Sequence, residues 1–184
     1  MYRKCTTEIS AQHQKQVEET LLELMQKFSY EDITVTQLCT EAGITRRVFY
    51  HLFNNKTDAL CALIDHTILD SESYRPEVPD QVLRFFLYWR AQERLMDALQ
   101  KNRMNNLLIE RMVEIILSED YDIRHWLNTN NTDTGMDILI FNLCGIMGIT
   151  YNWYLSGYAR SPQEMAALAV KLVPASPANK LPSV

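Results

Sequence analysis

A short segment, residues 46–53, constrains the fold more than any other because its two faces differ completely. At about 3.6 residues per turn, a helix over this segment places Arg46, Arg47, Tyr50 and His51 on one side. The other side is apolar and consists of Val48, Phe49, Leu52 and Phe53. Such a helix packs through its apolar face and presents a cationic, hydrogen-bonding face to solvent. We therefore expect this face to bind a polyanion.

A second helical pattern comes just before this segment. Its apolar residues recur at i, i+3, i+4 and i+7: Val35, Leu38, Cys39 and Ala42. Thr34 stands where an N-cap is expected, and Gly43 follows the last apolar residue, where a left-handed backbone costs glycine little. Thr45 is then placed to cap the second helix across a short turn. This arrangement predicts a helix-turn-helix, and we expect the cationic face of its second helix to bind DNA.

A third helix is predicted to begin directly after the motif. Asn55 and Asp58 form an N-x-x-D pair that is similar to a capping box. Lys56 lies in the first turn, where unpaired backbone N–H groups and the helix dipole favour a phosphate. We expect this helix, residues 56–70, to connect the helix-turn-helix to the rest of the chain.

The stretch from Thr34 to Lys56 resembles the DNA-binding domain of the TetR family of bacterial transcriptional regulators. The matching positions are Thr34–Val35, Ala42–Gly43, Ile44–Thr45–Arg46, Phe49–Tyr50, Phe53 and Lys56. The resemblance implies phosphate contacts by Thr36, Thr45, Tyr50 and Lys56. It implies that the residues nearest the bases are Arg46, Arg47 and His51. Arg47 stands where the family often has a small residue, and Leu52 where it often has His or Tyr, so the operator sequence is not transferable.

The composition is that of a folded protein, and its charges are unevenly distributed along the chain. The chain has 184 residues, 47% of them hydrophobic, which is enough for a sizeable core. No apolar run approaches the roughly 18 residues that span a bilayer, and no signal peptide is present, so we expect a cytoplasmic protein without a membrane segment. The net charge is −5, yet residues 42–57 contain three basic and no acidic residues. A local positive face is sufficient for docking to phosphates because the attraction is screened within about 8–10 Å.

The whole chain is predicted to be all-α, with a helix-turn-helix domain at residues 1–55 and a helical regulatory and dimerisation domain at residues 56–173. A first helix is expected from Glu8 or Ala11 to Lys27, and one long helix from about Pro79 to Lys101. Further helices are expected at 105–117 and 121–127, and the tail 174–184 should be disordered.

Two late helices, 136–156 and 161–173, carry more apolar surface than one subunit easily buries. The first is apolar on most sides and ends at Gly157, and the second opens with Ser161, Pro162 and Glu164 as cap, first-turn proline and capping-box glutamate. We expect a homodimer through a four-helix bundle, with a monomer core as the alternative. The TetR resemblance implies the same dimer.

The resemblance also implies that a small apolar effector binds inside the helical regulatory domain of each subunit. Aromatic and Met side chains suit such a pocket, and the candidates are Phe86, Trp89, Met112 and Trp126, although such residues are more often simply core. Control by a partner protein is the alternative.

Motifs for catalysis, a metal or a cofactor are absent, so we expect no enzyme activity, no metal and no cofactor. The predicted function is that of a sequence-specific DNA-binding regulator, and we favour a repressor over an activator. The rival is a TetR-like adaptor that acts through a protein partner without specific DNA binding.

Overall fold

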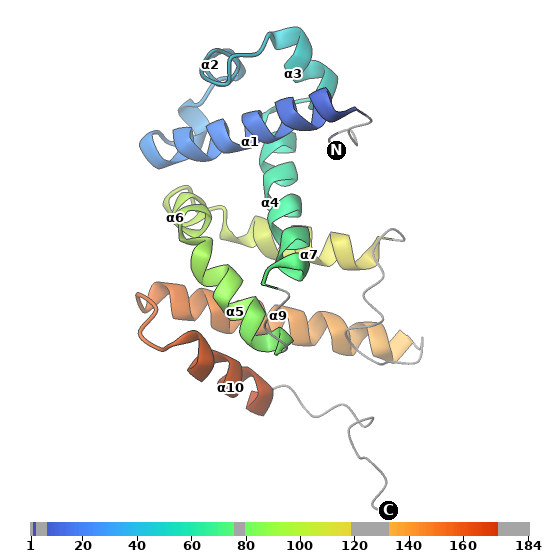
Figure 1. Ribbon diagram of the computed structural model, residues 1–184, viewed down its shortest axis with the longest axis vertical. Helices are drawn as coiled ribbons and strands as arrows, with labels where there is room; N and C mark the ends of the chain where they lie inside the picture. The colour runs from blue at the N-terminus through green and yellow to red at the C-terminus, as the bar shows by residue number, and fades with distance from the viewer. Residues whose placement is uncertain (1, 3–6, 76–79, 119–132, 173–184) are drawn as a thin grey trace, which may run out of the picture. The chain divides into compact units, whose positions relative to one another are not determined.

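The computed structural model describes residues 2, 7–75, 80–118 and 133–172. Within these ranges all regular secondary structure is α-helix or 3-10 helix, and there is no strand (Figure 1). The all-α prediction is confirmed. The elements are α1 (Glu8–Lys27), η1 (Tyr30–Asp32), α2 (Val35–Glu41), α3 (Arg46–Leu52), α4 (Lys56–Ser73), α5 (Gln81–Ala91), α6 (Glu93–Lys101), α7 (Asn105–Leu117), α9 (Asp133–Leu155) and α10 (Pro162–Leu172). The expected helix at 121–127 and the tail 174–184 lie outside the described residues.

The helices form two compact units. The first contains Met1–Asp70 and Glu93–Arg111, and the second contains Ser71–Gln92 and Met112–Val184. These units do not follow the predicted limits of 1–55 and 56–173, because most of α4 and all of α6 belong with α1–α3. The functional domain limits stay predictions.

The first unit is built on the apolar stripe of α1. Val17, Leu21 and Met25 are fully buried, and α2, α3 and α6 all pack against this helix. Thr7 accepts the backbone N–H of Ser10 and so caps α1 at the predicted start. Full burial of side chains of this size stabilises the fold by about 1.5–3 kcal/mol each, so this stripe fixes where the helix-turn-helix sits on α1.

The second unit has α5 at its centre. Phe86 is fully buried and meets the Trp153 ring edge-on, at 5.8 Å between ring centroids. α10 packs along α5 through Met165, Ala166 and Ala169. The Ser161–Glu164 capping box of α10 is present as predicted, with Ser161 N–H donating to the Glu164 carboxylate at 2.7 Å.

The prediction of one long helix from Pro79 to Lys101 is wrong. The helix breaks at Gln92, where ψ is 22° and the backbone N–H bonds to Trp89 O in a tighter turn. The break separates two helices with different partners, since α5 packs on α10 and α6 packs on α1. The apolar residues of α6, which include Leu95, Met96 and Leu99, are buried in the core of the first unit.

α9 corrects the expectation that no apolar run is long enough to span a bilayer. Met136–Leu155 has the length and mean hydropathy, 1.4, of a membrane span, with 22% of the window buried. A single helix that passes this test on length and composition is weak support for a membrane segment, because core helices pass it too.

Candidate nucleic-acid interface

The turn between α2 and α3 is formed by local hydrogen bonds. α2 ends at Glu41, and Gly43, two residues later, has a φ of 65°. The Gly43 and Ile44 N–H groups donate to Thr40 O at 3.2 Å and Cys39 O at 3.0 Å. These two bonds are a Schellman motif, which satisfies the last carbonyls of the helix. Thr45 then accepts the Val48 N–H at 3.3 Å and caps α3. The predicted caps and turn are therefore present in the structure.

The two faces of α3 separate as predicted. Phe49 is fully buried and Leu52 is 3% exposed, and they hold the helix on the core of the first unit. Four side chains of the opposite face are exposed: Arg46, Arg47, Tyr50 and His51. Thr36 on α2 and the cap Thr45 are exposed beside them. These six predicted residues thus share the accessible surface of the helix-turn-helix.

The two arginines are available for a partner. The Arg46 guanidinium lies 5.8 Å from the centroid of the Tyr50 ring, a cation–π contact within the same helix. Within the ranges that the structure describes, neither Arg46 nor Arg47 makes an ion pair with a carboxylate. Two exposed guanidinium groups without an acidic neighbour are suited to bind phosphate or a guanine edge.

Lys56, the seventh predicted residue, is held inside the chain. Its ammonium group donates to Tyr30 O at 2.5 Å, Glu31 O at 3.1 Å and Ile33 O at 2.8 Å. It also lies 4.4 Å from the centroid of the Tyr30 ring. The phosphate contact of Lys56 stays a prediction. Its observed contacts connect the start of α4 to η1, which sequence reasoning missed because the partners are 23 to 26 residues away.

A groove runs beside the exposed face of α3. Its volume is about 590 Å³, and its walls include Thr7, Ser10 and His13 of the α1 region together with Arg47 and His51 of α3. Nothing in the α1 sequence indicates that its first turns border the exposed face of α3, since this follows only from the packing of α1 on α3.

Polar contacts join α1, α4 and α7 on another side of the same unit. Asp65 and Arg111 form an ion pair at 2.6 Å, with only 6% and 12% of their side chains exposed. The Tyr2 hydroxyl donates to Asp65 at 3.0 Å. Burial, followed by the Asp65 charge, raises the pKa of Tyr2 well above its ordinary value. This buried pair was not predicted, because its members are 46 residues apart.

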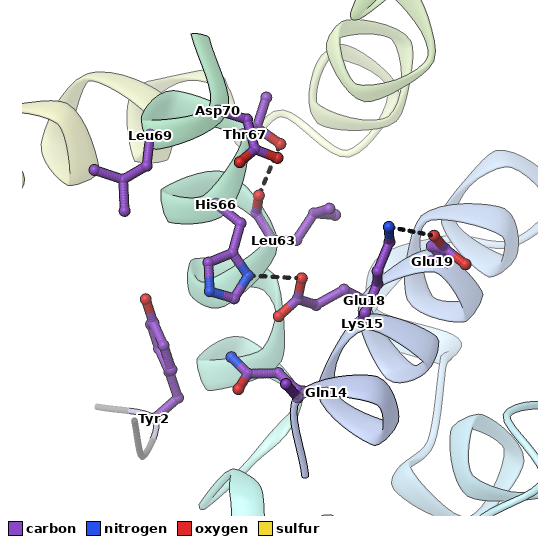
Figure 2. A pocket seen from close by; sticks show the side chains of 11 residues that line it. Tyr2, Gln14, Lys15, Glu18, Glu19, Leu63, His66, Thr67, Leu69 and Asp70 are labelled. Carbon is purple, nitrogen blue, oxygen red and sulfur yellow. Dashed lines mark hydrogen bonds and ion pairs between the residues drawn. The ribbon is translucent and has the colours of Figure 1, made fainter. Parts of the chain in front are cut away.

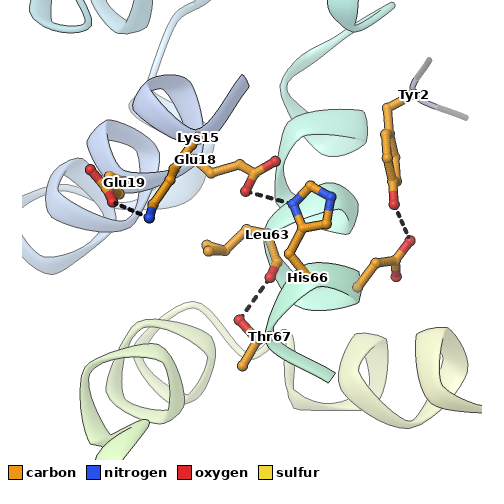
Figure 3. Close-up of polar contacts among 8 residues, drawn as sticks. Tyr2, Lys15, Glu18, Glu19, Leu63, His66 and Thr67 are labelled. Carbon is orange, nitrogen blue, oxygen red and sulfur yellow. Dashed lines mark hydrogen bonds and ion pairs between the residues drawn. The ribbon is translucent and has the colours of Figure 1, made fainter. Parts of the chain in front are cut away.

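His66 contacts Glu18 across the α1–α4 junction at 2.9 Å (Figure 3). The hydrogen bond to Glu18 raises the pKa of His66, although burial acts in the opposite direction. The His66 ring is hydrogen-bonded on one side and its side chain is 45% exposed. Within the described part of the chain, no group of three His, Cys, Asp or Glu side chains could hold a metal ion.

The predicted effector residues belong to the packed interior of the second unit. Phe86 and Trp89 are 0% and 1% exposed, and Met112 is 6% exposed. Phe86 lies in the core cluster with Trp153. Neither Phe86 nor Trp89 lines the groove beside α3, the cavity between α1 and α4 or the groove between α9 and α10. Trp126 lies outside the described residues. Their role in ligand binding stays a prediction.

Comparison with known proteins supports the fold. No protein-family model matches the chain, and no curated protein matches it. Among solved structures, it is similar to a protein described as dihydroxyacetone kinase operon activator DhaS, with 18% sequence identity and a TM-score of 0.55. The match covers 88% of this chain and 93% of that chain. The helices of this chain are therefore arranged in a TetR-like fold.

Proposed function

We propose that this chain is a sequence-specific DNA-binding transcriptional regulator of the TetR type, acting as a repressor in the cytoplasm. One observation carries the proposal: α3 buries Phe49 and Leu52 and exposes Arg46, Arg47, Tyr50 and His51. Among the residues that the structure describes, no carboxylate forms an ion pair with either arginine. A helix that only stabilised the fold would need the apolar side alone. The exposed side has the donors that read a major groove.

The exposed residues divide into two roles by their chemistry. Thr36, Thr45 and Tyr50 carry hydroxyl groups, which donate to phosphate oxygens and fix the position of the helix on the duplex. Arg46 and Arg47 carry guanidinium groups, which bind the O6 and N7 atoms of guanine in a bidentate manner. We assign sequence preference to the arginines and to His51.

The second unit supports a homodimer. Large apolar side chains of α9 and α10 are exposed, among them Phe141 at 71%, Val170 at 64% and Leu172 at 58%. An apolar groove of about 180 Å³ lies between these helices, lined by Ile146, Ile149, Ala169 and their neighbours. Exposed apolar area of this kind is typical of an interface. A second copy of the same two helices would cover it as a four-helix bundle.

A dimer would read an operator with two-fold symmetry. Two recognition helices placed about 34–36 Å apart, or a small multiple of that distance, engage two half-sites together. An effector that changes this spacing would release the DNA, because simultaneous binding of both half-sites provides most of the affinity. We propose this as the route of control.

Selection of binding sites from a random duplex pool at near-physiological salt tests the function. We expect the wild-type protein to recover a two-fold-related motif, and Arg47→Ala to lose roughly 1–3 kcal/mol per half-site with relaxed preference at one position. Arg94→Ala is the matched control, since Arg94 is an exposed arginine of α6 in the same unit. Recovery of no motif, with retention at low salt only, would reject specific binding and favour an adaptor.

Sedimentation velocity tests the dimer. Phe141→Glu would place a charge in the proposed interface and shift the protein to a monomer, whereas Ile109→Glu on α7 would leave the dimer intact. An unchanged dimer in Phe141→Glu would place the interface elsewhere. A reporter gene behind the recovered operator then gives the sign of regulation. Activation, the role in the description of DhaS, would overturn the repressor assignment.

A further inference from the structure

A cavity of about 650 Å³ lies at the junction of α1 and α4, within the first unit (Figure 2). α1 contributes Ala11, Lys15, Glu18 and Glu19 among others, and α4 contributes a second wall: Leu63, His66, Thr67, Leu69 and Asp70. Tyr2 stands on the opposite side of the space from Glu18 in Figure 2. The volume lies within the range of small-molecule sites, about 300–1,000 Å³.

Glu18 has one carboxylate oxygen without a hydrogen-bond partner. Its side chain is only 5% exposed, and its Oε2 atom lies 2.9 Å from the Nδ1 atom of His66. The Oε1 atom is buried and accepts no hydrogen bond from any group that the structure describes. Figure 2 shows the Glu18 carboxylate between His66 and Gln14, both of which also line the cavity. A buried oxygen of this kind is costly unless a donor reaches it.

The charge of the lining selects the kind of donor. Three carboxylates line the cavity, those of Glu18, Glu19 and Asp70, against the single ammonium group of Lys15 and the imidazole of His66. Lys15 faces Glu19 at 4.0 Å on the exposed rim and does not reach the Glu18 oxygen. Asp65 is already neutralised by Arg111. The lining therefore attracts a cation and repels an anion.

We propose that this cavity binds a small organic cation, an aliphatic amine or guanidine, whose N–H group donates to Glu18 Oε1. The hydrocarbon part of such a molecule would contact Ala11, Leu63 and Leu69, which supply the apolar surface of the walls. The Tyr2 hydroxyl, which donates to Asp65, retains lone pairs for a second N–H group. Four-carbon diamines and their guanidino derivatives have this chemistry.

The site belongs to the unit that carries the recognition helix, so on the proposed function its ligand would be an effector. Binding to the cavity itself requires no DNA. Cation binding can thus be measured on the free protein, whether or not the protein binds DNA. The effect of the cation on operator affinity is a separate measurement, and it alone depends on the proposed function.

Isothermal titration calorimetry of the full-length protein tests the site with putrescine and agmatine as probes. Succinate, a four-carbon dianion, is the matched control for size. We expect one of the cations to bind and succinate not to bind. Glu18→Gln should weaken the cation at least about tenfold, because a charge-assisted hydrogen bond is lost. Glu19→Gln, at an exposed position of the same helix, should weaken it less than about threefold.

A second variant keeps the test decisive where Glu18→Gln perturbs the fold. Ala11 is exposed and lines the cavity, so Ala11→Arg would place a guanidinium group in the space without removing a core contact. It should abolish binding of the cation while circular dichroism stays that of the wild type. Failure of both cations to bind at millimolar concentration would overturn the proposal. So would equal binding by Glu18→Gln, by Ala11→Arg, or of succinate.

Discussion

Replacement of Lys56 by methionine separates two roles of one ammonium group. The sequence predicts a phosphate contact, whereas the structure shows three hydrogen bonds to the carbonyls of Tyr30, Glu31 and Ile33 at 2.5–3.1 Å. Methionine keeps the length and most of the apolar volume of the side chain but removes all three donors. The change therefore tests the hydrogen bonds rather than the packing.

The expected loss of stability follows from these contacts. A hydrogen bond from a charged donor contributes about 1.5–3 kcal/mol, and a cation–π contact about 0.5–2 kcal/mol. The sum is less than additive, because Tyr30 O also accepts the Ile33 N–H at 3.2 Å and Lys56 is only half-buried. We expect Lys56→Met to lower the free energy of unfolding by about 2–4 kcal/mol. This loss corresponds to a decrease of about 1–2 M in the urea concentration at the midpoint of unfolding.

Urea unfolding followed by circular dichroism at fixed protein concentration measures this loss. Lys15→Met is the control, because Lys15 makes one exposed pair with Glu19 at 4.0 Å and should cost less than about 1 kcal/mol. Equal midpoints for the two variants would show that the Lys56 contacts contribute no stability. The salt dependence of DNA binding then reports the other role. A phosphate contact requires the slope to fall by about one per contact, or about two per dimer, and a purely structural lysine leaves it unchanged.

Three further predictions concern the first unit. Asp65→Ala should lower the free energy of unfolding by about 3–5 kcal/mol in the same urea assay, because Arg111 would keep a buried charge without its partner. The contribution of His66, measured as wild type minus His66→Gln in thermal unfolding, should be present at low pH and fade as pH rises through its raised pKa; a contribution that grows with pH would contradict the bond to Glu18. Gly43→Ala should cost about 1–2 kcal/mol from the left-handed backbone alone, since its Cβ would meet open space, and an unchanged melting temperature would exclude this strain.

The helix-turn-helix could be predicted from the sequence because its determinants are local. The caps Thr34 and Thr45, the glycine at 43 and the apolar spacing all act within a few residues, and each is found in place. Sequence periodicity also predicts which side of α3 is buried, since the helix has only one apolar face to pack.

The remaining features depend on which helix meets which, and periodicity carries no such information. The break at Gln92 divides a continuous helical pattern because α5 and α6 have different partners. The Glu18–His66 contact joins residues that are 48 positions apart in the sequence. That the second oxygen of Glu18 is buried without a hydrogen-bond partner can be known only from the structure. From the sequence alone, a polar residue on a helix is predicted to be exposed to solvent, because the helix that packs against it is not known.

Polar contacts, both local and long-range, concentrate on α4 and bear on the position of α3. At its start, Asp58 accepts the Asn54 backbone N–H at 3.2 Å, just beyond the end of α3, and Lys56 donates to η1. Farther along, Asp65 and His66 bond to α7 and α1. Hydrogen bonds are directional, so these contacts restrict both the rotation and the sliding of α4 more strictly than apolar packing does. Because α3 ends at Leu52 and α4 begins at Lys56, contacts that hold α4 against α1 also restrict the position of α3.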